Sequence, residues 1–338
     1  MYSITARRMT SGLVLKYLKE TGLVMGKCCA TALPRSSKVL LTRPVGALGT
    51  DDLTRNTQTL VQQAYGLREE GLSAWCHTGG YHVPLTTLTG SVRGDIVFLD
   101  PVIGVGELAI SDHRSSQPTL DEFLRIASEA HVAGLITGKA GIVHCHMGDG
   151  ERGLSMLEQA IATCEIPARV FNATHVNRNK PLFEQAAALA RHGCYIDATA
   201  YPCGHVEPGI SAAEAYIQFR DLGGHADRFT ISSDGGGCLP AFDHEGNLTR
   251  FGVGLSDTFP DMLRELTNRG VPMPEALAPL TSNVADLLKL HRKGCLNVDM
   301  DADLVVLDEN TAVRHVMARG EWHVRDGQIA RRGMYEQV

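Results

Sequence analysis

Four short segments of the chain place carboxylate or imidazole side chains near the ends of apolar runs. They are Gly104-Val-Gly-Glu107, His144-Cys-His-Met-Gly-Asp149, Thr174-His175-Val-Asn-Arg178 and Ser232-Ser-Asp234-Gly-Gly-Gly237. A carboxylate and two imidazoles can hold one divalent metal ion and leave a coordination position for water. A further aspartate beside that water can act as general base. The order Glu, His, His, Asp therefore predicts a metal-dependent hydrolytic site.

The second segment offers two histidines for one ligand position. A lone histidine after a strand is more often a hydrogen-bonded structural residue than a metal ligand. His144 and His146 are two residues apart, so both imidazoles would point to the same side of a strand. We assign the ligand role to His146, which lies nearer the expected strand end, and a structural role to His144.

Other polar side chains have possible substrate roles. Tyr81 could donate a hydrogen bond to a developing oxyanion, with packing as the alternative. Arg114 and Arg178 could clamp carboxylates in bidentate fashion. The alternative for these two arginines is a salt bridge to Asp112 or Asp149.

The elements that must position these residues form an alternating pattern. Short apolar runs alternate with amphipathic stretches, which is typical of βα units around a parallel sheet. In such barrels catalytic residues collect at the C-terminal ends of the strands, and one barrel takes about 250 residues. The 338 residues of the chain therefore fit an α/β fold with a TIM-like (β/α)₈ barrel. The expected strands are 102–110, 141–146, 168–172, 194–198 and 229–233, and the expected helices are 120–133, 181–191 and 274–290.

The pattern changes near the C-terminus. Short apolar runs at 303–307, 313–318 and 322–324 predict strands separated by turns at glycine. We therefore expect a barrel over 41–292 and the C-terminal part of a small β-domain, a partial β-sandwich, over 293–338. Residues 1–40 fit neither pattern and are an atypical N-terminal segment.

Composition limits the possible partners. The net charge is −6 with no run of Lys or Arg, so neither a nucleic acid nor a membrane surface is indicated. No apolar stretch reaches the ~18 residues that a membrane span needs. The nine cysteines are scattered without a Cys-x-x-Cys pair, and several, such as Cys145 and Cys194, lie in apolar contexts. This favours reduced, buried thiols in a cytoplasmic protein.

These motifs together resemble those of the isoaspartyl dipeptidases, which belong to the wider amidohydrolases. The resemblance runs from about Val45 to Gly333. It implies a (β/α)₈ barrel with a binuclear zinc site, where a metal-activated water attacks the isopeptide bond of β-aspartyl dipeptides. It also implies a homo-oligomer. The segments that carry it are Gly49-Thr-Asp51, Thr78-Gly-Gly-Tyr-His-Val-Pro84, Ala109-Ile-Ser-Asp-His-Arg-Ser115, His146-Met-Gly-Asp149, Thr174-His-Val-Asn-Arg178 and Ser232-Ser-Asp-Gly235.

The resemblance also implies roles for single residues. His146 and His175 match the ligands of the second metal. Asp234 matches a ligand that also serves as general acid and base, and Tyr81 matches the tyrosine that polarises the scissile carbonyl. The residues that match substrate-binding positions are Thr50, Arg114, Arg178 and Cys238, the last of which stands where the family usually has a serine.

Two further departures from the family concern the metals. Some members bridge the two metals with a carboxylated lysine, where this chain has Glu107. A glutamate has the same charge and an oxygen pair, and its shorter arm requires a small backbone adjustment at Gly106. The family also places a His-x-His pair on the first barrel strand, whereas no histidine precedes His77 here.

The missing pair leads to several expectations. The first metal should bind poorly, because it loses two imidazole ligands. Glu107, His146 and His175 can still hold one zinc at the second metal site. We therefore expect one or two zinc ions, with the second site favoured. Our hypothesis is that a truncation, a shifted reading frame or a misassigned start replaced the residues before about position 40. The open functions are an active β-aspartyl dipeptidase, a catalytically impaired homologue, or a dihydroorotase-like or D-aminoacylase-like amidohydrolase.

Overall fold

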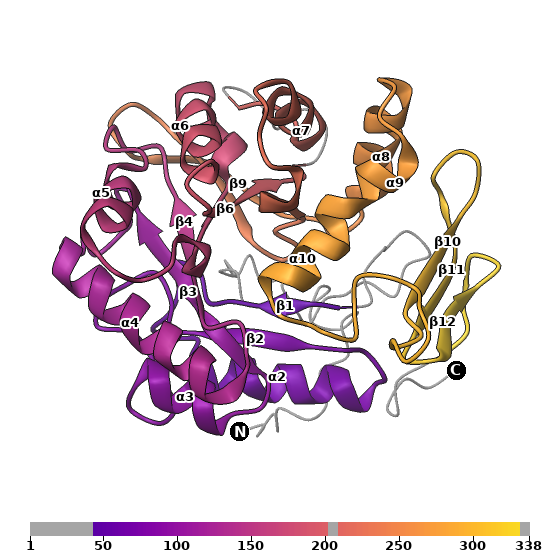
Figure 1. Ribbon diagram of the computed structural model, residues 1–338, viewed down its shortest axis with the longest axis horizontal. Helices are drawn as coiled ribbons and strands as arrows, with labels where there is room; N and C mark the ends of the chain where they lie inside the picture. Colours follow the sequence, from indigo (N-terminus) through magenta and orange to yellow (C-terminus); the bar gives the residue numbers. More distant parts are fainter. Residues whose placement is uncertain (1–42, 202–208, 332–338) are drawn as a thin grey trace.

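The computed structural model describes residues 43–201 and 209–331 (Figure 1). The atypical segment 1–40, with the hypothesis about its origin, lies outside the described residues.

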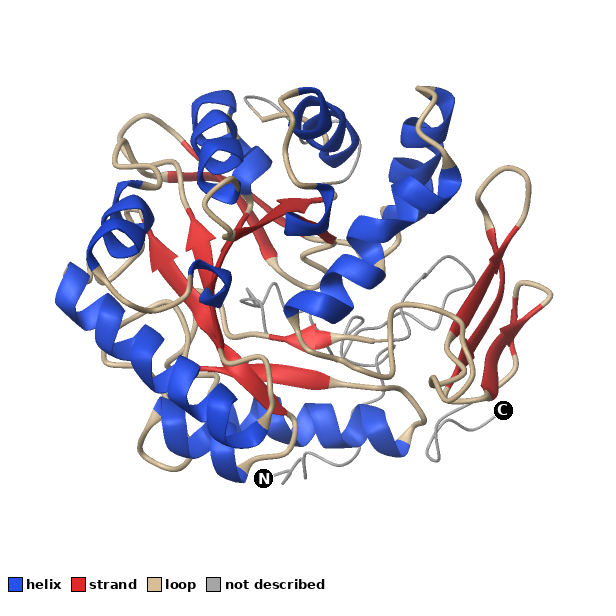
Figure 2. Ribbon diagram, viewed as in Figure 1, coloured by secondary structure: helices blue, strands red, loops and turns tan. Residues whose placement is uncertain are grey.

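Seven parallel strands form one curled sheet in which neighbours in sequence are neighbours in space (Figures 1 and 2). This confirms the α/β class, and the described strands make an open, partial barrel. Within the described residues, the first and last strands each pair on one side only. The strands are β1 (Val45–Gly46), β2 (Trp75–Thr78), β3 (Val102–Ile110), β4 (Ile142–Met147), β5 (Phe171–Thr174), β6 (Tyr195–Thr199) and β7 (Phe229–Ser232).

The helices between the strands lie along the outer face of the curled sheet, and the helices after β7 lie at its open side (Figure 1). This is the arrangement that right-handed βαβ crossovers produce. None of the helices in the described ranges is long and apolar enough to cross a membrane. The helices are α2 (Thr57–Glu69), α3 (Val92–Phe98), α4 (Leu120–Thr137), α5 (Ser155–Thr163), α6 (Lys180–Ala190), α7 (Ala212–Asp221), α8 (Phe259–Asn268), α9 (Met273–Leu277) and α10 (Ser282–Leu287).

Local sequence explains the central elements. Every residue of β3 is buried, as expected for a parallel strand covered on both faces. Helix α4 begins with a capping box between Thr119 and Glu122 and ends at Gly138, whose φ of 74° suits a left-handed cap. Phe123 of α4 stacks on Phe171 of β5, with ring centroids 5.6 Å apart. Helix and sheet are thus joined through a close-packed aromatic contact.

Two of the predicted elements were wrong in detail. The expected strand 168–172 begins three residues later, because residues Ala168–Val170 form a 3₁₀ turn in which the Val170 N–H donates to the Pro167 carbonyl at 2.9 Å. The expected helix 274–290 is broken into α9, a 3₁₀ turn and α10. Pro279 in that turn lacks an N–H, and Thr281 has non-helical φ and ψ of −127° and −86°.

The C-terminal sequence forms an antiparallel sheet, as predicted, beside the barrel (Figure 2). Lys293 contacts both the barrel and the C-terminal part. Its Nζ lies 2.7 Å from Ser73 Oγ, just before β2, and 2.6 Å from Asp303 Oδ2, just before β10. A two-stranded hairpin after β7 was not predicted. The strands are β8 (Cys238–Phe242) and β9 (Leu248–Val253) in the hairpin, and β10 (Leu304–Leu307), β11 (Val313–Ala318), β12 (Glu321–Arg325) and β13 (Gln328–Ile329) in the sheet.

The cysteines in the described ranges form no disulfide with one another. Cys145 and Cys194 are buried, but Cys295 is exposed, so the expectation of burial was wrong for that residue.

Candidate metal centre

A bulge in β3 carries Glu107 into the barrel interior. Gly106 pairs with His144 and Leu108 pairs with Cys145, so Glu107 is an extra residue relative to β4. Gly106 has a φ of 147°, and a Cβ there would lie 2.5 Å from the His144 carbonyl oxygen. Only glycine accepts both conditions. Gly106 therefore permits the bulge, and the bulge places a carboxylate that is 4% exposed.

Glu107, His146 and His175 form a buried group whose ligand atoms all lie within 4.8 Å of one another. Glu107 Oε2 lies 3.4 Å from His146 Nδ1, and Glu107 Oε1 lies 3.6 Å from His175 Nε2. His146 comes from β4, and His175 follows β5 directly with a φ of 65°. One carboxylate and two imidazoles are a donor set that suits a divalent cation with a free position for water. The three predicted ligands thus come together, in a group capable of binding a metal.

His144 has the structural contacts expected for it. Its Nδ1 lies 2.5 Å from Asn172 Oδ1, and its ring stacks on His77 with centroids 5.5 Å apart. Its Nε2 is 3.7 Å from Glu107 Oε1. The assignment of His146 rather than His144 to the metal group is consistent with this arrangement.

Neighbouring polar groups orient both histidines. His146 Nε2 lies 3.0 Å from Asp112 Oδ2, and His175 Nδ1 lies 2.6 Å from Thr199 Oγ1. Burial alone would raise the pKa of Asp112, but hydrogen bonds from His146 and Arg114 outweigh it and hold that pKa well below its usual value. Asp112 is therefore ionised. In the sequence analysis Asp112 was named only as a salt-bridge partner of Arg114, although it lies in one of the segments that carry the family resemblance.

Tyr81 lies in the loop after β2 and is 2% exposed. Its hydroxyl is 2.7 Å from His146 Nδ1. Burial, and then the charge of Glu107, raise the pKa of Tyr81 well above its usual value, so the phenol stays protonated. The structure thus brings Tyr81 to the metal group as a hydrogen-bond donor.

The two arginines differ in their surroundings. Arg114 makes a bidentate contact with Asp112, through Nε at 2.9 Å and Nη2 at 2.6 Å, and its Nη2 lies 3.3 Å from His146 Nε2. Arg178 Nη1 lies 3.3 Å from Asp149 Oδ2, and its buried Nε has no hydrogen-bond partner within the described ranges. Both salt bridges that the sequence offered as alternatives exist, and Arg114 in addition contacts the metal group.

The remaining predicted residues lie around the same end of the sheet. Asp234 lines one cavity with Glu107 and His175, although it is not part of the group of three. A Cβ on Gly237 would lie 2.0 Å from Asp234 Oδ1, so a side chain there would displace the Asp234 carboxylate. Thr50 is half-buried in the loop after β1, and Cys238 is half-buried at the start of β8.

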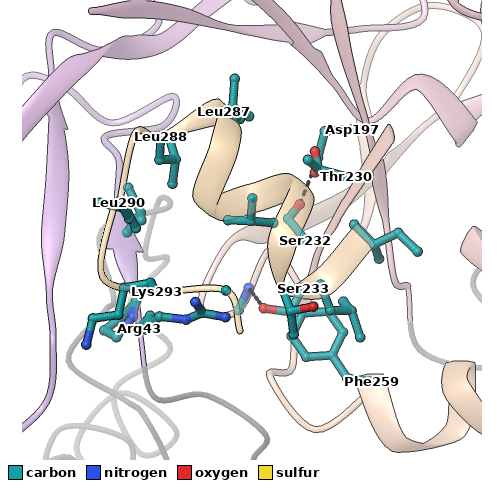
Figure 3. Close-up of a pocket in the computed structure, with 18 of the residues that line it drawn as sticks. Arg43, Asp197, Thr230, Ser232, Ser233, Phe259, Leu287, Leu288, Leu290 and Lys293 are labelled. Atoms are coloured by element: carbon teal, nitrogen blue, oxygen red, sulfur yellow. Dashed lines mark hydrogen bonds between the residues drawn. The ribbon is translucent and has the colours of Figure 1, made fainter. Parts of the chain in front are cut away.

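That cavity has a volume of about 600 Å³ and extends between the two edge strands of the sheet. Arg43 and residues of β1 line one side, and Thr230 and Ser232 of β7 line the other (Figure 3). Asp197 of β6 accepts hydrogen bonds from Thr230 Oγ1 at 2.7 Å and Ser232 Oγ at 2.6 Å. Leucine side chains from the segment after β7 form an apolar wall of the cavity. Leu287, Leu288 and Leu290 are labelled in Figure 3. The sequence reasoning missed Asp197, which lies inside a strand and follows no motif.

The amidohydrolase family model matches residues 102–323, and this chain belongs to that family. Within the family it is a homologue of a β-aspartyl dipeptidase. The crystal structure of the β-aspartyl dipeptidase from the thermophilic keratin-degrading Fervidobacterium islandicum AW-1, in complex with the β-Asp-Leu dipeptide, is 42% identical with a TM-score of 0.82. The match covers 87% of this chain and 78% of that one.

Two other structures are also similar to this chain. A second structure of the Fervidobacterium islandicum AW-1 dipeptidase is 39% identical with a TM-score of 0.80, covering 89% of this chain and 78% of that one. A D-hydantoinase from Bacillus sp. AR9 is 14% identical with a TM-score of 0.55, covering 87% of this chain and 80% of that one. The hydantoinase shares the fold alone. The chain is thus a β-aspartyl dipeptidase-like amidohydrolase with a buried His/Glu metal-binding group.

Proposed function

We propose that this protein hydrolyses the isopeptide bond of β-aspartyl dipeptides with a zinc-activated water. The observation that carries the proposal is the buried group of Glu107, His146 and His175. It occurs in a chain that is 42% identical to a dipeptidase crystallised with β-Asp-Leu. We also propose that the protein works as a homo-oligomer, as the resemblance implies.

Glu107, His146 and His175 would hold the zinc ion, which when bound lowers the pKa of a water molecule and polarises the carbonyl. Asp234 would act as general base and acid, taking a proton from the attacking water and giving it to the leaving amine. Its position in the same cavity as Glu107 and His175 supports this role. In this assignment Asp234 also contributes a ligand.

The substrate is oriented by groups around the cavity. The Tyr81 phenol donates a hydrogen bond to the oxygen on which negative charge develops. Arg114 and Arg178 bind the two carboxylates of the dipeptide, since a guanidinium matches a carboxylate in bidentate geometry. Thr50 and Cys238 complete the substrate contacts.

A second candidate is a catalytically impaired homologue. The described residues contain one group of three metal-capable ligands rather than two. A dihydroorotase-like or D-aminoacylase-like activity is less well supported, because two arginines beside the site suit a substrate with two carboxylates.

Zinc content and hydrolysis of β-Asp-Leu separate the candidates. We expect one zinc per chain and turnover, with both lost in Glu107→Gln. The exposed Glu158 on α5 provides a control, since Glu158→Gln should change neither. Zinc binding without turnover would support the impaired homologue. Two zinc ions with turnover would mean that ligands outside the group of three complete a second site.

A further inference from the structure

Asp112 joins the metal group to one of the arginines. It lies just after β3 and is 4% exposed. Its Oδ2 lies 3.0 Å from His146 Nε2 and 2.6 Å from Arg114 Nη2. Its Oδ1 accepts from the Arg114 Nε at 2.9 Å and from the Arg114 backbone N–H at 2.7 Å. One buried carboxylate thus contacts both a metal-ligand histidine and a substrate-binding arginine.

Asp112 forms a bidentate ion pair with Arg114, so its carboxylate accepts hydrogen bonds, and the 3.0 Å contact favours a proton on His146 Nε2. Arg114 Nη2 lies farther from this nitrogen, at 3.3 Å, and donates to Asp112 instead. In the neutral imidazole, Nδ1 is then left with a lone pair. This is the nitrogen that lies 3.4 Å from Glu107 Oε2 and 2.7 Å from the Tyr81 hydroxyl. The contact with Asp112 therefore decides which nitrogen of His146 is available to a metal ion.

The backbone around Asp112 leaves its side chain little freedom. A Cβ on Gly148 would lie 2.4 Å from the Asp112 Cβ, so the loop after β4 packs directly against this residue. Arg114 is thus paired with a buried carboxylate, whereas the carboxylate that contacts Arg178 is exposed. Asp149, the partner of Arg178, is 61% exposed, and it accepts hydrogen bonds from Arg178 and Asn179.

We propose that Asp112 is a positioning residue that serves two binding events at once. It holds His146 in the tautomer that presents Nδ1 to the metal, and it fixes the plane of the Arg114 guanidinium for a substrate carboxylate. The second part rests on the proposed function, whereas the first needs only metal binding.

The first test compares Asp112→Asn with Asp149→Asn. The zinc dissociation constant is measured on metal-free protein by competition with a chelator. A carboxylate that orients a metal-bound histidine is typically worth 10–100-fold in affinity, so we expect Asp112→Asn to bind zinc about 10–100-fold more weakly. Asp149→Asn should bind zinc like the wild type. At saturating zinc, KM for β-Asp-Leu should also rise in Asp112→Asn.

The second test needs neither metal nor activity. Nitrogen NMR of histidine-labelled, metal-free protein reports the tautomer of His146, whose signal is assigned by its loss in His146→Gln. We expect the proton on Nε2 in the wild type and a mixture of tautomers in Asp112→Ala. A wild-type proton on Nδ1, or unchanged zinc affinity in folded Asp112→Asn, would overturn the proposal. If the wild type binds zinc but does not cleave β-Asp-Leu, the proposed function fails, while the zinc and NMR results still decide the role of Asp112.

Discussion

Glu107 reaches the metal group through an adjustment of the backbone rather than through a long side chain. The extra residue in β3 carries its carboxylate to within 3.4 Å of His146 Nδ1 and 3.6 Å of His175 Nε2. A glutamate is a permanent carboxylate, whereas a carboxylated lysine must first combine with carbon dioxide. We therefore predict that zinc affinity is unchanged in buffers stripped of carbon dioxide and bicarbonate. A loss of affinity that bicarbonate restores would mean that a lysine, not Glu107, completes the site.

Tyr81 provides a prediction that separates catalysis from metal binding. Its phenol is a hydrogen-bond donor and faces the ligand nitrogen of His146. Removing one donor to a developing oxyanion typically costs about 10²–10³ in kcat, so Tyr81→Phe should lose activity by that factor. Zinc affinity should not fall, because the variant removes a group that competes for His146 Nδ1. Steady-state kinetics with β-Asp-Leu and chelator competition measure the two effects, and a parallel fall in zinc affinity would contradict the assigned role.

His77 gives a pH-dependent prediction. Burial, and then the neighbouring His144, lower the pKa of His77 to about 3. The unfolded chain therefore binds a proton near pH 6.5 that the folded chain does not bind, and stability falls as the pH drops from about 6.5 toward 3. One such proton is worth about 1.4 kcal/mol per pH unit, so His77 costs about 2 kcal/mol between pH 7.5 and 5.0.

The test is urea unfolding of the wild type and His77→Gln at these two pH values. The variant should lose about 2 kcal/mol less than the wild type over this interval. His192, exposed at the end of α6, provides the control, since His192→Gln should follow the wild type. Equal pH dependence in all three proteins would mean that His77 is protonated in the fold.

At the scale of elements, the bulge in β3 can be tested through its glycine. Gly106 combines a φ of 147° with a Cβ position only 2.5 Å from a backbone oxygen. Gly106→Ala must therefore shift β3 against β4, which displaces Glu107. We expect a loss of roughly 2 kcal/mol or more in unfolding free energy together with loss of zinc binding.

Gly90 is the matched control, because its φ is 92° but nothing lies within 4 Å of the Cβ position. Gly90→Ala should lose some stability and keep its zinc affinity. If Gly106→Ala binds zinc as the wild type does, the bulge is not what places Glu107.

The sequence predicted the elements whose signal is local. The continuous apolar run of β3 and the alternating run of β11 were placed at their observed bounds. The sequence could not show features that depend on tertiary contacts. Examples are the break of the last long helix around Pro279 and the contact between Asp112 and His146, which are 34 residues apart. The hairpin of β8 and β9 was missed although Gly246 marks its turn, because Pro240 interrupts the apolar run of β8 and β9 is largely exposed.

At the scale of the whole molecule, the metal group lies on three adjacent strands of an open sheet. Glu107 comes from β3, His146 from β4 and His175 from the end of β5, so the ligands converge only when these strands are paired. Zinc bound to this group should therefore stabilise the folded chain and not the unfolded one. At a free zinc concentration of 100 times the dissociation constant, the unfolding free energy should rise by about 2.7 kcal/mol.

Thermal and urea unfolding with and without zinc measure this effect, and a chelator should reverse it. Glu107→Gln should show little stabilisation by zinc, because the carboxylate that faces both imidazoles is gone. Exposed histidines such as His244 could also bind zinc weakly, so His244→Gln is included and should respond like the wild type. Equal stabilisation of the wild type and Glu107→Gln would place the zinc outside the barrel. Stabilisation confined to proteins with an intact Glu107 would mean that the same three side chains bind the metal and hold the central strands together.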